Sequence, residues 1–305
     1  MADINLSELP FDYKVYQHWY ETQQVPYEIV KQLAGRETVF FGLNIKVRCI
    51  KAHYVGILKS NFERFELNKI LNIYHSVARL NGMPIFSYNP AERKPQQDEF
   101  TKKFANYLTH YDFFLDIDGK RGFDKVYESA ARCKELFDKF QVRYSLRSSG
   151  SGFHIFVLQE DAGIGKFQAS REEYDKYCYE TSQSVSDEGI SEIPMGKVMY
   201  DRLRAYESVA KSLKLIEGVL DIDDTIYQIR RVCKCPYTID YKTGNLCLPL
   251  DDAQFKALES DSNIIKPEFV LKNPKYLYNR GTLIRNGLPE GKGFENLMGY
   301  VIDGN

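Results

Sequence analysis

The sequence has almost no net charge and no long apolar segment. Lys and Arg number 41 and Asp and Glu 42, which gives a formal net charge of −1. This balance excludes a uniformly basic surface, so any nucleic acid must be bound through local positive potential. No apolar run approaches the roughly 20 residues that span a bilayer. Residues 1–14 lack the apolar core of a secretory signal. We therefore expect a soluble, cytoplasmic protein, at the nucleoid if the source is prokaryotic.

Cysteine is scarce, and several catalytic motifs are missing. The chain has 6 Cys, none spaced CxxC and none placed with a His at zinc-finger spacing. Buried, reduced thiols are the expectation, and no zinc site is predicted. In GIGKF (163–167), Glu160 stands where a Walker A motif needs its first glycine and Phe167 where it needs Ser or Thr. The chain also contains no GxSxG, HExxH or Rossmann fingerprint.

What is present is an ordinary globular composition with strong local periodicity. Hydrophobic residues make up 43% and charged residues 27%, typical of a packed domain. The pattern predicts a mixed α/β chain. The expected helices are 16–34, 63–80, 123–140, 196–217 and 224–234; the expected strands are 38–49, 111–117, 142–148 and 153–158, with a hairpin over 237–250. Positive charge is concentrated in 119–147 and 266–292.

Two carboxylates end the buried strand FFLDI. Asp116 and Asp118 are two residues apart, so both side chains point to the same face. Like charges this close repel unless a cation lies between them. Such a pair suits Mg²⁺ or Mn²⁺ for phosphoryl transfer. The alternative is a solvated pair that caps the next helix.

A second acidic cluster could supply a third carboxylate. Asp221 and Asp223 share a face if 218–223 is extended, and Asp224 follows them. One of these residues brought to the first pair would complete a two-metal site. The alternative is that Asp223 or Asp224 caps a helix beginning at Thr225.

A turn of small residues precedes a histidine in SSGSGFHIF. Small residues let backbone N–H groups approach an anion closely. His154 begins the next strand, two residues after Gly152, and can direct a ring nitrogen into the same space. This combination suits nucleotide phosphates, whereas the alternative is an ordinary hairpin turn with a half-buried histidine.

Together these segments resemble the archaeo-eukaryotic primase superfamily, which includes primase small subunits and primase-polymerases. FFLDIDG (113–119) is similar to its first motif and SGSGFHIFV (149–157) to its second. Residues 221–250, with an Asp, basic residues, a Pro and a KTG hairpin, are similar to its third. GRETVFF (35–41) resembles a segment near the start of primase small subunits. The motifs follow the order of the family and span 35–250.

The resemblance implies roles for individual residues. Asp116, Asp118 and Asp223 (or Asp221) would be catalytic and bind two divalent ions. Asp223 is favoured, because Arg231 and Lys234 then fall where the family places basic residues. Nucleotide-binding residues would be Ser149, Ser151, His154, Arg231, Lys234 and Lys242, and Arg36 would bind template. Ser151 stands where primase small subunits often have Arg, Asp240 where a His often precedes KTG, and no zinc-binding insertion is present.

The implied fold has two modules, and the implied activity is template-directed nucleotidyl transfer. An N-terminal α/β module would cover about 1–105, an RRM-like catalytic module about 106–255 and a helical tail about 256–305. The enzyme would make or extend primers on single-stranded DNA from NTP or dNTP. Further candidate partners are a helicase, a large primase subunit or a mobile-element or defence-system protein. Alternatives are a gap-filling polymerase that never initiates, a two-metal nuclease and a non-catalytic nucleic-acid-binding module.

Overall fold

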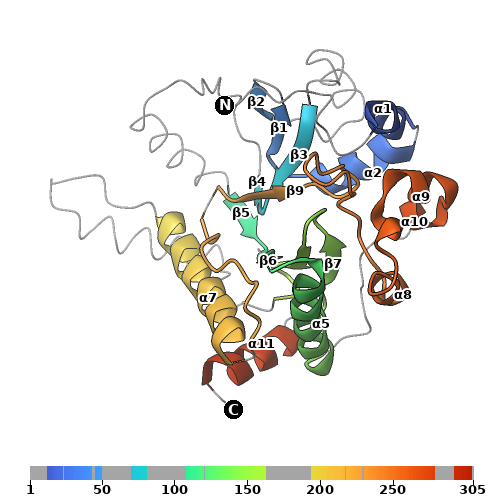
Figure 1. Cartoon of the computed structure of the whole chain (residues 1–305). Coiled ribbons are helices and arrows are strands. Elements are labelled where there is room, and N and C mark those ends of the chain that lie inside the picture. Colours follow the sequence, from blue (N-terminus) through green and yellow to red (C-terminus); the bar gives the residue numbers. More distant parts are fainter. Residues whose placement is uncertain are drawn as a thin grey trace, which may run out of the picture.

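The computed structural model describes residues 12–22, 24–42, 45–49, 70–80, 108–119, 121–162, 194–216, 218–228, 230–278 and 292–303. These residues form helices and small antiparallel sheets, which confirms the predicted mixed α/β class. Two larger sheets lie one above the other in the view of Figure 1. None of the helices in the described ranges is long and apolar enough to cross a bilayer.

The first sheet has four strands in the order β2-β1-β3-β9. Its members are β1 (Thr38–Gly42), β2 (Ile45–Cys49), β3 (Ile70–Ser76) and β9 (Val232–Lys234). Helices α1 (Tyr13–Glu21) and α2 (Gln24–Leu33) precede it. The indole of Trp19 donates a hydrogen bond of 2.8 Å to the carbonyl of Tyr237, which ties α1 to the segment after β9.

The helix predicted over 63–80 is wrong for the part that the structure describes. Residues 70–80 form β3 and then β4 (Ala78–Leu80), which pairs with β5 (Leu108–Tyr111); residues 63–69 lie outside the described ranges. Consecutive residues of β3 are buried: Asn72, Ile73, His75 and Ser76. A strand buried on both faces shows no clear alternation, so its period cannot be distinguished from that of a buried helix.

The second sheet carries the candidate site, in the order β6-β8-β7. Strand β6 (Phe113–Ile117) leads to helix α5 (Phe123–Lys139), strand β7 (Ser145–Ser148) and strand β8 (Phe153–Val157). The predicted succession of strand, helix, strand, turn and strand is therefore confirmed. Helix α5 packs on one face, where the Phe113 and Phe137 rings stack with centroids 6.4 Å apart. Helix α7 (Pro194–Ile216) also contacts β6.

The helix predicted over 224–234 is wrong, because this segment makes turns and then joins the first sheet. Thr225 donates from its backbone N–H (3.0 Å) and its hydroxyl (2.6 Å) to the Asp223 carboxylate, which holds a turn instead of a helix. Cys233 and Cys235 are both buried, and this period of two fits strand β9. The predicted turn at 242–244 is present, with the N–H of Gly244 donating to the carbonyl of Asp240 at 2.8 Å.

Short helices follow the hairpin. They are α8 (Asp252–Ala257), a 3-10 turn (Ser262–Ile265), α9 (Pro267–Lys272), α10 (Lys275–Tyr278), α11 (Lys292–Met298) and a π turn (Gly299–Asp303). The aromatic ring of Phe294 from α11 lies 4.9 Å from that of Phe113. This end of the chain thus covers the second sheet. The module boundaries proposed above stay predictions.

Candidate active site

Distant segments of the sequence meet at the end of β6. Strand β8 pairs with one edge of β6 and places His154 opposite Asp116. The segment around Ile222 pairs with the other edge. There the N–H of Asp118 donates to the carbonyl of Asp221, and the N–H of Asp223 to the carbonyl of Asp116, both at 2.9 Å. The backbone therefore brings both acidic clusters together.

The side chains of Asp221 and Asp223 have different surroundings. Asp221 is 5% exposed and accepts hydrogen bonds from Arg121 (Nε to Oδ1, 2.9 Å) and from the hydroxyl of Ser129 on α5 (2.6 Å). The hydrogen bond from Arg121 is the main cause that lowers the pKa of Asp221. Asp223 is partly exposed, and its carboxylate accepts the backbone N–H and the hydroxyl of Thr225. Asp221 is thus engaged in holding α5 and Arg121, whereas Asp223 is bonded within its own turn.

Asp116 is compensated by protein cations and hydrogen bonds. Its Oδ2 accepts a hydrogen bond of 2.8 Å from Nη2 of Arg231, and its Oδ1 lies 3.5 Å from Nε2 of His154. Burial alone would raise the pKa of Asp116, but the hydrogen bond from His154 and the charges of Arg231 and Lys234 lower it overall. Burial lowers the pKa of His154 more than Asp116 raises it, so the ring is neutral near pH 7. Its Nδ1 has no hydrogen-bond partner within the described residues.

The pKa of Asp118 is shifted in the opposite direction to that of Asp116. The protein around its carboxyl, and then the negative charges of Asp116 and Asp223, raise its pKa. Three carboxylates, one of them destabilised by the others, fit divalent cations that prefer oxygen ligands. Among the described residues, however, no three His, Cys, Asp or Glu side chains stand close enough to hold a metal ion as they are. Arg231 already contacts one oxygen of Asp116.

The turn at 149–152 lies directly against the carboxylates. A Cβ added at Gly152 would stand 2.3 Å from the carbonyl oxygen of Ile117 and 3.3 Å from Cβ of Asp118, so only glycine fits. Gly150 has a φ of +90°, which favours glycine. Ser149 is buried, and its hydroxyl accepts the N–H of Gly152 at 3.1 Å. Ser151 is exposed and borders a hollow of about 580 Å³ that Thr243 and Asn245 also line.

The predicted basic residues reach this region from β9 and the hairpin. Lys234 donates to the carbonyl of Ser149 at 2.7 Å and lies 2.8 Å from Oδ1 of Asp240. Asp240 is 1% exposed and also accepts the hydroxyl of Thr243 at 3.0 Å. Lys242 is exposed at the tip of the turn. Sequence reasoning noted Asp240 only as a departure from the family pattern and missed that it holds Lys234 beside the turn.

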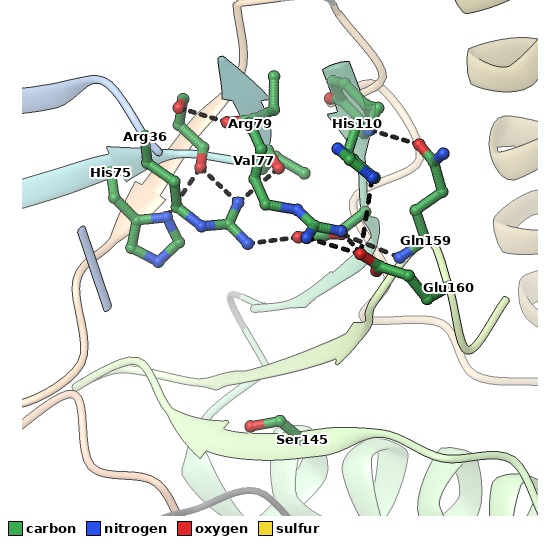
Figure 2. A network of polar contacts seen from close by, with 12 residues as sticks. Arg36, His75, Val77, Arg79, His110, Ser145, Gln159 and Glu160 are labelled. Carbon is green, nitrogen blue, oxygen red and sulfur yellow. Dashed lines mark hydrogen bonds and ion pairs between the residues drawn. The ribbon is translucent and has the colours of Figure 1, made fainter. Parts of the chain in front are cut away.

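Arg36, the predicted template-side residue, is not brought to the carboxylates. It is 8% exposed, donates to the carbonyls of Ser76 (3.0 Å) and Val77 (2.6 Å), and forms an ion pair with buried Asp112. Arg79 joins the same carboxylate at 3.1 Å and also reaches Glu160 (Figure 2). This network links β3 and β4 to the start of β6. No local pattern indicates this network, because Asp112 and Arg79 belong to no motif.

Comparisons with known proteins found one kind of likeness. No family model and no curated protein matches the chain. Among solved structures, the chain is similar to the polymerase domain of Mycobacterium tuberculosis Ligase D, which was solved in complex with DNA. The identity is 11%, the match covers 90% of this chain and 91% of that chain, and the TM-score is 0.47.

Proposed function

We propose that this chain is a template-directed nucleotidyltransferase that synthesises or extends primers on single-stranded DNA. The observation that carries the proposal is the meeting of Asp116, Asp118 and Asp223 with the turn and His154 at one end of β6. These groups come from three separate segments of sequence. Clusters of titratable groups with pKa values shifted in opposite directions are typical of functional sites.

The residues fit a two-metal site in the chemistry of their donors. Asp116, Asp118 and Asp223 would hold two divalent ions, Mg²⁺ or Mn²⁺. When bound there, such ions supply a lowered pKa for an attacking 3′-hydroxyl and neutralise charge on the departing pyrophosphate. The raised pKa of Asp118 is consistent with this assignment, because it comes from burial of the carboxyl and then from the negative charges of Asp116 and Asp223.

The remaining groups would orient the triphosphate. The N–H groups of Ser149 and Gly152 bond within the turn 149–152, so the turn would offer the N–H groups of Gly150 and Ser151 and the hydroxyl of Ser151. Neutral His154 stands on the same side, next to Asp116. Arg231, Lys234 and exposed Lys242 would supply positive charge to phosphates or to the template backbone.

A primer-free incorporation assay tests the proposal. Wild type would be incubated with single-stranded template and Mn²⁺ or Mg²⁺, with ribo- and deoxynucleotides supplied separately, beside an annealed-primer reaction. We expect incorporation that is lost in Asp116→Asn. Extension of annealed primers alone would identify a polymerase that does not initiate. DNA binding without incorporation in either reaction, or degradation of labelled DNA without nucleotides, would overturn the proposal.

A further inference from the structure

Arg231 occupies the side of Asp116 that a metal ion would need. Its Nη2 lies 2.8 Å from Oδ2 of Asp116, and the other oxygen faces His154. The Asp116 side chain is only 14% exposed, so few other directions remain open to a cation. A divalent ion on Oδ2 and a guanidinium on the same oxygen would repel each other.

The guanidinium of Arg231 is partly exposed and is held by one carboxylate among the described residues. The side chain is 32% exposed at the edge of the first sheet, just before β9. Its Nε is buried and makes no hydrogen bond within the described residues. Asp116 is the carboxylate that it pairs with in the described part of the chain. A new anionic partner could therefore compensate the loss of this contact.

Asp116 lies in a cluster of carboxylates. Burial of the Asp118 carboxyl, and then the negative charges of Asp116 and Asp223, raise the pKa of Asp118. The charge of Lys234 also lowers the pKa of Asp116, but Lys234 is paired with Asp240 at 2.8 Å. Among the described residues, Arg231 is the arginine or lysine that contacts Asp116 directly.

We propose that Arg231 is a placeholder cation: it occupies Oδ2 of Asp116 until a metal ion binds, and it thereby couples the binding of metal to the binding of nucleotide. With a divalent ion held by Oδ2 of Asp116, Arg231 would leave that oxygen, and its guanidinium would pair with the phosphates of a nucleoside triphosphate. Each ligand favours the state that the other needs, so binding of one strengthens binding of the other. The inference rests on the proposed function, since it needs the carboxylates to bind metal.

Metal binding measured without catalysis tests the placeholder. Mn²⁺ would be titrated by electron paramagnetic resonance, with and without a non-hydrolysable nucleoside triphosphate. We expect Arg231→Gln to bind Mn²⁺ about tenfold more tightly than wild type without nucleotide, which corresponds to about 1.4 kcal/mol. The nucleotide should increase the Mn²⁺ affinity of wild type. The factor of this increase should be at least tenfold smaller in Arg231→Gln.

Two variants serve as controls. Lys256→Gln removes an exposed cation on α8 and should bind Mn²⁺ as wild type does. Arg231→Lys keeps the positive charge but loses the planar guanidinium, so its Mn²⁺ affinity should lie between those of wild type and Arg231→Gln. This variant replaces Arg231→Gln in the test if Arg231→Gln does not fold.

The outcomes separate the two proposals. Equal Mn²⁺ affinity in wild type and Arg231 variants, lost in Asp116→Asn, would overturn the placeholder and leave the metal site standing. No Mn²⁺ binding that depends on Asp116 in any of the proteins would overturn the metal site itself.

Discussion

Replacing Asp116 or Asp118 by Asn should change the stability of the metal-free protein in opposite directions. The two residues differ only in their neighbours. Asp116 accepts a hydrogen bond of 2.8 Å from Arg231 and is stabilised as an anion. Asp118 is solvent-exposed, but nearby protein partly desolvates its carboxyl, and this effect and then the charges of Asp116 and Asp223 destabilise it as an anion. We expect Asp118→Asn to raise the melting temperature and Asp116→Asn to lower it.

The magnitudes follow from the contacts. Residues two apart on a strand stand about 6.6 Å apart. At that distance two unit charges repel by about 0.6 kcal/mol in water and about 2.5 kcal/mol at an effective dielectric constant of about 20. Asp118 is exposed, so a gain of about 0.5–1 kcal/mol is expected after solvent screening. A hydrogen bond to a charged group contributes about 1.5–3 kcal/mol, so Asp116→Asn should lower the free energy of unfolding by an amount in this range.

Thermal melts in EDTA at neutral pH would measure both effects. One kcal/mol shifts the melting temperature by about 2–4 °C in a protein somewhat smaller than this one. Asp118→Asn should therefore gain about 1–4 °C and Asp116→Asn lose about 3–12 °C, with the double variant between them. Glu135→Gln, an exposed carboxylate on α5, is the control and should stay within 1 °C, about the size of a surface substitution.

The pH dependence gives a second check, and its sign follows from the pKa directions. The pKa of Asp118 is raised, so its destabilising charge is present above that pKa and is lost as the pH falls through it. The pKa of Asp116 is lowered, so its stabilising charge is lost only at still lower pH. Both variants should approach wild type in acid, Asp118→Asn first. Equal destabilisation by the two substitutions at neutral pH would refute the reasoning.

Three further predictions concern the other residues of the site. Asp223→Ala should lower the incorporation rate by orders of magnitude, as measured in single-turnover assays. Asp221→Ala should instead lower the free energy of unfolding by about 2–3 kcal/mol in denaturant titrations, because Arg121 and Ser129 lose their partner. A large loss of rate in Asp221→Ala with little loss in Asp223→Ala would show that the assignment is wrong. His154→Ala should lower kcat/KM for nucleotide about ten- to a hundredfold with little effect on template binding, because a hydrogen bond to a charged group is lost; an unchanged KM and kcat in folded protein would remove His154 from the site. Lys242→Ala should reduce the slope of log K against log salt for single-stranded DNA by about 0.7 if its ammonium neutralises one phosphate; an unchanged slope would place Lys242 away from the nucleic acid.

The sequence predicted the second sheet well and parts of the first poorly, for a physical reason. In β6, α5, β7 and β8 each element has a distinct period and is bounded by glycine or a turn, so local pattern and structure agree. Strand β3 is buried on both faces and shows no period of two. The segment 225–231 is shaped by the Asp223 carboxylate and by pairing of β9 with β3, both of which depend on the fold.

The same distinction applies to the candidate site. DxD, SGSGFH and the KTG turn could be found because each is a short local pattern. Asp223 could be preferred over Asp221 only through spacing to Arg231 and Lys234, and the structure supplies the physical contrast, since Asp221 is held by Arg121 and Ser129. The contact between Arg231 and Asp116 spans 115 residues, and no local pattern could indicate it.

A site that must bind both cations and anions can stay nearly neutral by pairing its own charges, and this matches a chain whose net charge is −1. Here Arg231 is paired with Asp116 and Lys234 with Asp240. Such pairing lowers the positive potential offered to nucleic acid in the absence of metal, because each basic group has an internal partner. Release of Arg231 would restore positive charge only when metal replaces it on Asp116. Affinity for a nucleoside triphosphate should therefore depend on the divalent ion more steeply than one phosphate contact alone would require, and the coupled Mn²⁺ titration measures that dependence.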